Sequence, residues 1–473
     1  MIIDEIHGEF VRLREEIRKG PIYPEVTAEE IRNHLAVRYS FSEPVDLDLV
    51  VTDVEEMLRT WQVQVTHPRY FGLFNPSVTL ASVVADTLVA MHNPQLASWR
   101  TSPAANEIER FTLEWLATRF GLPRNTIASF TNGGAEANLS AVVVALTRAF
   151  PEYGEKGLRC IGTTPAIYLT EEAHHSFNKI AHMTGLGRSA LRLVATDGEL
   201  KMDLGDLKRR IAEDRSNGFF PLMVVGTCGT TTAGAIDPLL ELGRFCRETG
   251  LWFHVDAAWG GAAIISPSLR HHLAGIETAD SITCDAHKWF SVPMGCGMFF
   301  CRYPESVAQA FRADTSYMPR QGDSSTFDPY THSVQWSRRF IGLKLFLSLA
   351  QHGEAGHAEM IDRQTRMGQL LRETLTASGW RIVNSSPLPV LCFTREGLDI
   401  TRFLKSMREH QVAWMSEARI GETPVVRACI TSFRTTERDI HAVVDEMNRL
   451  VAQDAIGLPG SAMYSPDEVA SSL

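Results

Sequence analysis

The chain has 473 residues, of which 44% are hydrophobic and 22% are charged, a balance typical of a globular protein with a sizeable core. Its formal net charge of −10 argues against nucleic acid or an anionic membrane as the main partner. No apolar run reaches membrane-spanning length, the start of the chain is acidic, and the eight cysteines form no CxxC pair. These features predict a cytoplasmic protein with reduced, mostly buried thiols.

The first 80 residues have the pattern of helices. Apolar residues recur at three- and four-residue spacing over 6–17 and 46–62, with a proline-rich link between these stretches. Such a segment is too short to bury a core of its own, so we expect it to pack on a second subunit. The loop that follows carries Phe71 and Phe74, which either cover the core or line a binding site. Ser102 and Pro103 then predict the start of a helix.

Strands and helices alternate from about residue 127. Seven short apolar strands are expected, at 127–131, 167–170, 191–195, 222–226, 251–255, 281–284 and 297–301. Helical patterns fill most of the gaps, at 135–150, 175–185, 204–215 and 238–250. This alternation predicts an α/β fold with a mainly parallel seven-stranded sheet and helices on both of its faces. Ligands bind such sheets at the carboxyl ends of the strands.

The pattern changes after residue 301. Residues 312–335 are polar and predict a long loop of the kind that often forms a functional lid. A long helix is expected from Ser337, followed by strands at 380–383, 389–394 and 425–430 in a smaller α+β lobe. We therefore expect four parts, namely an N-terminal helical segment, a large domain, a small C-terminal domain and a tail, over 1–80, 81–345, 346–452 and 453–473.

Polar motifs follow several of the strands. Asn132, Gly133, Gly134 and Ala135 offer backbone N–H groups at a helix N-terminus, which suits a phosphate, although glycine pairs there are more often plain turns. His174 follows the next strand, in a tandem pair of histidines. No third ligand stands at metal spacing, so we expect no metal site, and an imidazole stacked on a flat cofactor is the functional alternative to a structural histidine.

Three further candidates complete this edge of the sheet. Thr231 lies in a threonine- and glycine-rich turn and could bond a cofactor oxygen, or merely form the turn. Asp256 closes one apolar strand and Lys288 follows the next, where loss of hydration favours a nucleophilic amine. A simple ion pair is the alternative for these two. Together, however, the motifs supply an anion cradle, a stacking ring, a nitrogen partner and a Schiff-base lysine, which are the parts of a pyridoxal 5′-phosphate site.

From about residue 60 to 451 the chain resembles the group II pyridoxal phosphate decarboxylases, which include aromatic amino acid, histidine, glutamate and cysteine sulfinate decarboxylases. The resemblance implies the fold type I architecture of the aspartate aminotransferase superfamily and a homodimer with sites at the interface. The similar stretches, in chain order, are HPRYFG, SPAANEIE, FTNGGAEAN, AHHSF, GTTTAGAID, HVDAAWGG, DAHKW, DTSY, QWSRRFIGLKL and VVRACI.

The resemblance also implies roles for individual residues. Lys288 matches the Schiff-base lysine, Asp256 the partner of the pyridine nitrogen, and His174 the ring that stacks on the cofactor opposite Ala258. Tyr317 matches the loop tyrosine that protonates carbon after carbon dioxide leaves. The remaining matches are Thr231 beside the ring hydroxyl, Arg427 facing the substrate carboxylate, and Asn132 to Ala135, Asp285 and His287 near the phosphate. Asp285 departs from the commoner asparagine, which puts a direct phosphate contact in doubt because like charges repel.

The resemblance implies decarboxylation of an L-amino acid to its amine. Phe71, Phe74 and Trp99 favour an aromatic or imidazole side chain, and Ser337 stands where the relatives differ with substrate size. The AAWGG stretch instead resembles the branch that acts on small acidic amino acids, so that alternative stays open, as does diaminobutyrate. An aldehyde synthase, a carbon–carbon lyase and a non-catalytic interaction protein are further alternatives. Tyr317 argues against the first, the HKW stretch against the second, and the set of Asp256, Lys288 and Tyr317 against the third.

Overall fold

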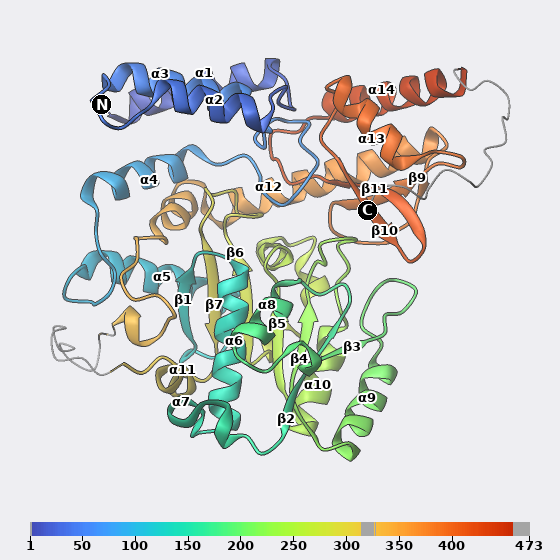
Figure 1. The fold of residues 1–473 in the computed structure, drawn as a ribbon. Coiled ribbons are helices and arrows are strands. Elements are labelled where there is room, and N and C mark those ends of the chain that lie inside the picture. Colours follow the sequence, from blue (N-terminus) through green and yellow to red (C-terminus); the bar gives the residue numbers. More distant parts are fainter. Residues whose placement is uncertain (1, 314–325, 327, 457–473) are drawn as a thin grey trace.

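The computed structural model describes residues 2–313, 326 and 328–456 (Figure 1). All seven predicted strands are confirmed, and they form one sheet in the order β1-β7-β6-β5-β4-β2-β3. Only β7 is antiparallel to its neighbours; every other pairing in this sheet is parallel. The strands are β1 Ile127–Thr131, β2 Thr164–Thr170, β3 Leu191–Val194, β4 Phe219–Thr227, β5 Trp252–Asp256, β6 Ser281–Asp285 and β7 Gly297–Cys301.

Helices cover both faces of this sheet, as the sequence predicts. Val224 and Val225 are neighbours on β4, yet they belong to different hydrophobic clusters, because side chains alternate between the faces of a strand. The first cluster contains residues of α5, α9 and α10, and the second contains residues of α6, α8 and α11. These helices are α5 Pro103–Arg119, α6 Gly134–Ala149, α7 Tyr153–Lys156, α8 Ser176–Met183, α9 Leu204–Ser216, α10 Leu239–Thr249 and α11 Pro304–Ala310.

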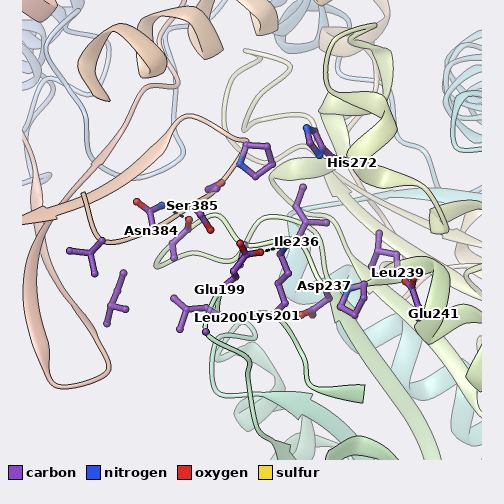
Figure 2. A pocket seen from close by; sticks show the side chains of 18 of the residues that line it. Glu199, Leu200, Lys201, Ile236, Asp237, Leu239, Glu241, His272, Asn384 and Ser385 are labelled. Atoms are coloured by element: carbon purple, nitrogen blue, oxygen red, sulfur yellow. Dashed lines mark hydrogen bonds and ion pairs between the residues drawn. The ribbon is translucent and has the colours of Figure 1, made fainter. Parts of the chain in front are cut away.

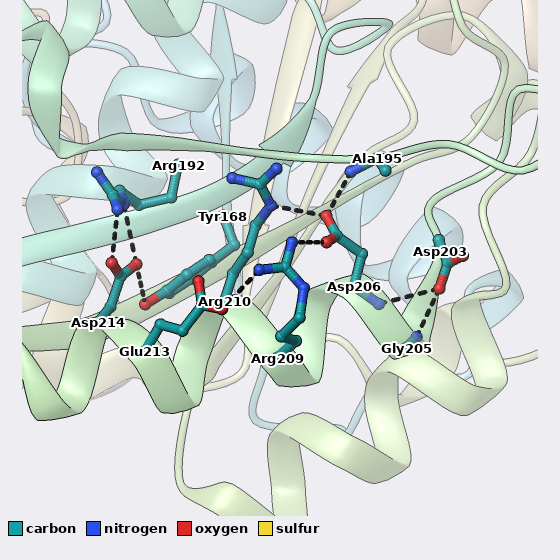
Figure 3. A network of polar contacts seen from close by, with 10 residues as sticks. All are labelled: Tyr168, Arg192, Ala195, Asp203, Gly205, Asp206, Arg209, Arg210, Glu213 and Asp214. Carbon is teal, nitrogen blue, oxygen red and sulfur yellow. Dashed lines mark hydrogen bonds and ion pairs between the residues drawn. The ribbon is translucent and has the colours of Figure 1, made fainter.

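Polar contacts fix the outer strands of the sheet to α9 (Figure 3). Asp203 caps the helix by accepting hydrogen bonds from the first-turn N–H groups of Gly205 and Asp206. Near the other end of α9, buried Asp214 accepts two bonds from Arg192 of β3, at 2.9 and 2.6 Å, and one from Tyr168 of β2 at 2.9 Å. These bonds hold the strand that leads to His174.

The N-terminal segment forms a layer outside the sheet (Figure 1). It contains α1 Ile2–Lys19, α2 Ala28–Arg38 and α3 Leu47–Thr60, and α4 Leu80–His92 follows. The two predicted helices are confirmed, but the expected link between them contains a further helix, α2. This helix starts at a capping box in which Thr27 and Glu30 bond each other's backbone. Neither α2 nor α3 buries a single residue in the chain.

The prediction that a helix starts at Ser337 is wrong, because α12 spans Leu343–Ala377. The segment before it is held by a buried ion pair instead. Arg338 donates to both carboxylate oxygens of Glu109, at 3.0 and 2.5 Å, and the N–H of Gly342 donates to the same carboxylate at 2.9 Å. Those bonds fix a non-helical path up to Gly342.

A four-stranded antiparallel sheet forms the C-terminal part, in the order β10-β11-β9-β8. Three of its strands were predicted; β10 was not, because it is short and alternates between half-buried and exposed residues. Its elements are β8 Arg381–Ile382, β9 Val390–Thr394, α13 Ile400–Glu409, β10 Ser416–Ile420, β11 Thr423–Cys429 and α14 Glu437–Ile456. Most of the predicted tail lies outside the described residues. Within the described ranges, no helix is both long and apolar enough to cross a bilayer.

Candidate active site

The predicted polar motifs meet at one cavity of about 280 Å³ at the carboxyl ends of β1, β2, β4, β5 and β6. Each motif reaches the cavity from the end of a different strand, as expected for a doubly covered parallel sheet. The predicted residues that line it are Asn132, Gly133, Gly134, Ala135, His174, Thr231, Asp256, Ala258, Asp285, His287, Lys288 and Phe74.

The start of α6 forms one wall of the cavity. The helix begins at Gly134, and the N–H groups of its first turn have no acceptor within the helix. A Cβ atom added to Gly134 would lie 3.1 Å from an Asp285 carboxylate oxygen and 3.2 Å from the Ala258 side chain, so the backbone here runs close to the ends of β5 and β6. Free N–H groups at a helix N-terminus fit a phosphate group.

A buried carboxylate closes β5. Asp256 is 4% exposed, and its two oxygens accept hydrogen bonds from the Ala258 N–H at 3.1 Å and from the Asn138 amide at 2.8 Å. Beside it in register on β4 stands Thr227, whose buried hydroxyl has no partner. A carboxylate and an unpaired hydroxyl on the cavity wall leave polar groups for a bound molecule to satisfy.

Lys288 pairs with Asp285 rather than with Asp256. Its Nζ lies 3.1 Å from Asp285 Oδ2, and His287 Nε2 lies 3.7 Å from the same oxygen. The other oxygen of Asp285 is buried without a hydrogen-bond partner. The simple ion pair weighed for Asp256 and Lys288 is therefore not formed, which leaves Asp256 free of a cation and Lys288 held toward the cavity.

Partial burial lowers the pKa of the His174 imidazole below its ordinary value, which favours the neutral form. Its Nδ1 accepts a hydrogen bond from the Ser176 N–H at 3.2 Å, so the ring proton belongs on Nε2. Burial also raises the pKa of the Glu172 carboxyl, which lines the same cavity. A neutral, flat ring at this place suits stacking on an aromatic cofactor.

Aromatic rings form the apolar side of the cavity. Phe74 stacks on Trp259 with 4.4 Å between ring centroids, and Trp259 stacks on Trp289 at 5.0 Å. Lys288 Nζ lies 5.8 Å from the centroid of Phe74. The side chain of a substrate bound near Lys288 would therefore meet an aromatic surface.

The two alternatives for the loop of Phe71 and Phe74, a cover over the core or the lining of a site, apply to one residue each. Phe71 is fully buried in the hydrophobic core of the C-terminal lobe, and its N–H donates to the Trp414 carbonyl at 2.9 Å. Phe74 is only 8% exposed and lines the cavity of its own chain. Their loop packs inside one subunit because Gly72 fits closely under the Trp414 ring. A Cβ atom added to Gly72 would lie only 2.2 Å from that ring.

The other predicted substrate residues do not line this cavity. Trp99 is half-buried and its indole donates to Glu107 at 2.9 Å, and Ser337 is exposed and accepts a bond from Gln95 at 2.9 Å. Arg427 is buried directly behind the cavity wall, with its guanidinium carbon 5.0 Å from the Phe74 centroid. Tyr317 lies outside the described residues.

Six cavity residues were missed from the sequence: Asn138, Glu172, Thr227, Gly229, Trp259 and Met294. A signal existed for two of them. Asn138 stands one helical turn after Gly134, on the same face of α6, and Thr227 ends β4 as Asp256 ends β5. The other four have no such positional signal.

A larger cavity lies elsewhere (Figure 2). It measures about 790 Å³ and is formed by residues 198–201, 235–241 and 382–387 together with Ala233, His272, Ala274 and Ile420. None of the predicted site residues lines it. Asp237 and Asn384 in its wall already bond backbone groups, so we assign the chemistry to the smaller cavity.

The fold and the site define a fold type I pyridoxal phosphate enzyme. The free amides at the start of α6, the unpaired Thr227 hydroxyl and the Asp256 carboxylate fit the phosphate and ring of that cofactor. The chain matches the family model described as the pyridoxal-dependent decarboxylase conserved domain over residues 32–396. It therefore belongs to this family of pyridoxal-phosphate-dependent carboxy-lyases.

Similar proteins agree with this membership. The chain is 27% identical over 453 residues to 4-hydroxyphenylacetaldehyde synthase of Rhodiola rosea, covering 92% of this chain and 90% of that protein. It is 26% identical to the aromatic-L-amino-acid decarboxylase of Bacillus atrophaeus, covering 94% and 93%. The crystal structure of Catharanthus roseus tryptophan decarboxylase with L-tryptophan shares the fold, with a TM-score of 0.86 at 23% identity and coverage of 95% and 97%.

Proposed function

We propose that the protein decarboxylates an aromatic L-amino acid to the corresponding amine and carbon dioxide. The observation that carries this proposal is the single cavity in which Lys288, Asp256 and His174 face an aromatic wall of Phe74 and Trp259. Two similar proteins support the same substrate class. The name of one includes an aromatic product, and the name of the other includes aromatic amino acids as its substrates.

Pyridoxal phosphate, when bound, supplies the electron sink that takes up the electron pair left by the departing carbon dioxide. Lys288 would hold the cofactor aldehyde covalently, and Asp256 would keep a proton on the ring nitrogen. Amides at the start of α6 would hold the phosphate, and His174 would stack on the ring. Asp285, 3.1 Å from Lys288 Nζ, would orient that amine when it is free.

Two further roles complete the proposal. Tyr317 is the proposed general acid at the α-carbon. Arg427 donates to the Thr231 carbonyl at 2.7 Å and to the Gly72 carbonyl at 2.8 Å, while its Nη2 is buried without a partner. We propose that this remaining donor faces the substrate carboxylate. The same arginine would thereby tie substrate binding to the loop that carries Thr231.

Activity on a panel of amino acids tests the substrate class. The panel comprises L-tryptophan, L-tyrosine, L-phenylalanine, L-histidine, L-glutamate, L-cysteine sulfinate and L-2,4-diaminobutyrate. The cofactor-loaded protein should release carbon dioxide fastest from an aromatic member, because Phe74 and Trp259 offer no charged group to a polar side chain. A preference for an acidic or basic member would overturn the aromatic proposal.

An aldehyde synthase is the second candidate, because one similar protein carries that name. The tyrosine at 317 argues against it, since a residue able to protonate the α-carbon directs the reaction toward amine. The products of the reaction, amine against aldehyde, separate the two candidates.

We expect the protein to be a homodimer. Helices α2 and α3 bury no residue in the chain, and around them Val37, Phe41 and Leu47 are 90%, 96% and 72% exposed. Apolar surface of this extent favours a protein partner. Sedimentation of the cofactor-loaded protein should give twice the chain mass, and a Phe41→Glu, Leu47→Glu variant should weaken the assembly. A fully active monomer would contradict the expectation.

Ser337 offers a test of substrate size. It is exposed in its own chain and caps no helix, so we propose that it lines the site of a second copy. Ser337→Gly should then raise kcat/KM for tryptophan relative to histidine, with a shift of about 1–3 kcal/mol for a group of this size. Ser216→Gly, at the exposed end of α9, is the control. An unchanged ratio would remove Ser337 from the site.

We further propose that the protein works in the cytoplasm. All eight cysteines are unpaired, and seven of them are buried. Burial raises the pKa of several of these thiols, for instance Cys301 and Cys392 to about 12, which keeps them protonated and unreactive. Thiols in this state are typical of proteins in a reducing compartment.

A further inference from the structure

A chain of buried side chains runs behind Asp256, away from the cavity. The Asn138 amide donates to Asp256 Oδ2 at 2.8 Å, and the Asn138 oxygen lies 3.0 Å from His254 Nε2. On its other side, His254 Nδ1 lies 2.8 Å from the Ser281 hydroxyl, which is 2.9 Å from the Trp252 indole nitrogen. Each of these residues is at most 6% exposed, so water does not compete for the bonds.

Only one direction of hydrogen bonding fits this chain. The Asp256 carboxylate can only accept, so the Asn138 NH₂ group faces it and the Asn138 oxygen accepts from His254 Nε2. At the other end, the indole N–H of Trp252 donates to the Ser281 oxygen, whose hydroxyl can donate to His254 Nδ1. Burial lowers the pKa of His254 to about 4, so the imidazole is neutral and carries its one proton on Nε2. That N–H donates to the Asn138 oxygen, and the Thr283 hydroxyl donates to the same oxygen at 2.7 Å.

Every donor in the chain therefore points toward Asp256. Two bonds to its oxygen fix the Asn138 amide with its NH₂ group turned to the carboxylate, because the opposite orientation would set the Asn138 oxygen against an Asp256 oxygen. Hydrogen bonds aligned in one direction polarise one another and stabilise the negative charge at their end.

We propose that Asn138 is a positioning residue that holds Asp256 ionised and turned toward the cofactor's ring nitrogen, with His254, Ser281, Thr283 and Trp252 fixing its orientation. This inference rests on the proposed role of Asp256. This series of hydrogen-bonded side chains extends the site from the cavity, through α6, β5 and β6, to the opposite end of the sheet. It predicts that a change at Asn138 alters the protonation of the cofactor.

The test is Asn138→Leu, a substitution of similar size without hydrogen bonds. Protein is loaded with pyridoxal phosphate labelled with ¹⁵N in the ring, and the nitrogen resonance and cofactor Kd are measured. The nitrogen should move from the protonated range of the wild type toward the unprotonated range, with cofactor binding weakened about tenfold, as for loss of one charged hydrogen bond. A role confined to packing would lower the Tm of the cofactor-free protein and leave the nitrogen resonance unchanged, which would overturn the inference.

Three further variants make the result decisive. Tyr168→Phe removes a buried hydrogen bond to Asp214 on the far side of the sheet and should leave the nitrogen unchanged. Asp256→Asn must shift the nitrogen; if it does not, the proposed role of Asp256 fails, whereas a shift in this variant alone overturns only the role of Asn138. Should Asn138→Leu not fold, Thr283→Val removes one donor to Asn138. It should shift the nitrogen and the Kd in the same direction by less, and no change in either would overturn the inference.

Discussion

Replacing Lys288 with alanine is expected to abolish covalent attachment of pyridoxal phosphate and with it the decarboxylation. Lys288 is the lysine of the cavity lining, and Asp285 holds its Nζ at 3.1 Å. Without an amine at this place the cofactor aldehyde has no nucleophile to bind. The visible absorption band of the lysine-bound cofactor should disappear, and borohydride treatment should leave no cofactor mass on the protein.

Lys179→Ala is the matched control, because Lys179 is exposed on α8. This variant should keep the band, the borohydride adduct and the activity of the wild type. Cofactor that remains covalently bound in the Lys288→Ala variant would show that another lysine serves, and the assignment of the site would be wrong.

Tyr317→Phe should leave cofactor binding intact and lower the rate of amine formation by about 10²–10⁴-fold, the usual contribution of a general acid. The α-carbon then lacks its proton donor after carbon dioxide departs. Reaction with dioxygen should divert part of the product to aldehyde, ammonia and hydrogen peroxide. Chromatography of amine and aldehyde, together with a peroxide assay, measures this partition.

Tyr303→Phe serves as the control, since Tyr303 bonds Asp280 at 3.0 Å, beyond the N-terminal ends of the strands. It should not change the ratio of amine to aldehyde. Wild-type amine production by the Tyr317→Phe protein would mean that another group delivers the proton, with Lys288 as the next candidate within the cavity.

The sequence was sufficient for the sheet and for much of the cavity lining. Strands such as LWFHVD and SITCD are fully buried and end in a carboxylate, and in a parallel sheet such ends meet at one edge. The position of Asp256 and Lys288 at one cavity followed from that rule alone.

Other features depended on contacts between segments far apart in the chain. The spacing of apolar residues in the sequence does not reveal such contacts. The start of α12 is set by Glu109, 234 positions before Leu343 in the chain, through its bonds to Arg338 and Gly342. Phe71 and Phe74 look equivalent in sequence, but the first packs into the C-terminal lobe and the second onto Trp259. The pairing of Lys288 with Asp285 was also unexpected. Asp285 lies only three residues before Lys288, but the family resemblance placed it near the phosphate.

Asn138 shows why the back of the site was missed. The spacing of Asn138 from Gly134 places it near the cavity, but its role depends on contacts with His254 and Thr283 from two different strands. Neither Trp99 nor Ser337 lines the cavity of its own subunit, so a role in the site would require a second copy of the chain.

The most direct test of the central claim is the stoichiometry of the reaction. Purified protein loaded with pyridoxal phosphate is given carboxyl-labelled L-tryptophan, L-tyrosine or L-phenylalanine, and carbon dioxide and amine are counted together. Asp256, Lys288 and the aromatic wall of the cavity predict equal amounts of the two products from at least one of these substrates, without peroxide. Carbon dioxide accompanied by aldehyde and ammonia in place of amine, or no carbon dioxide from any of the three, would contradict the proposed function.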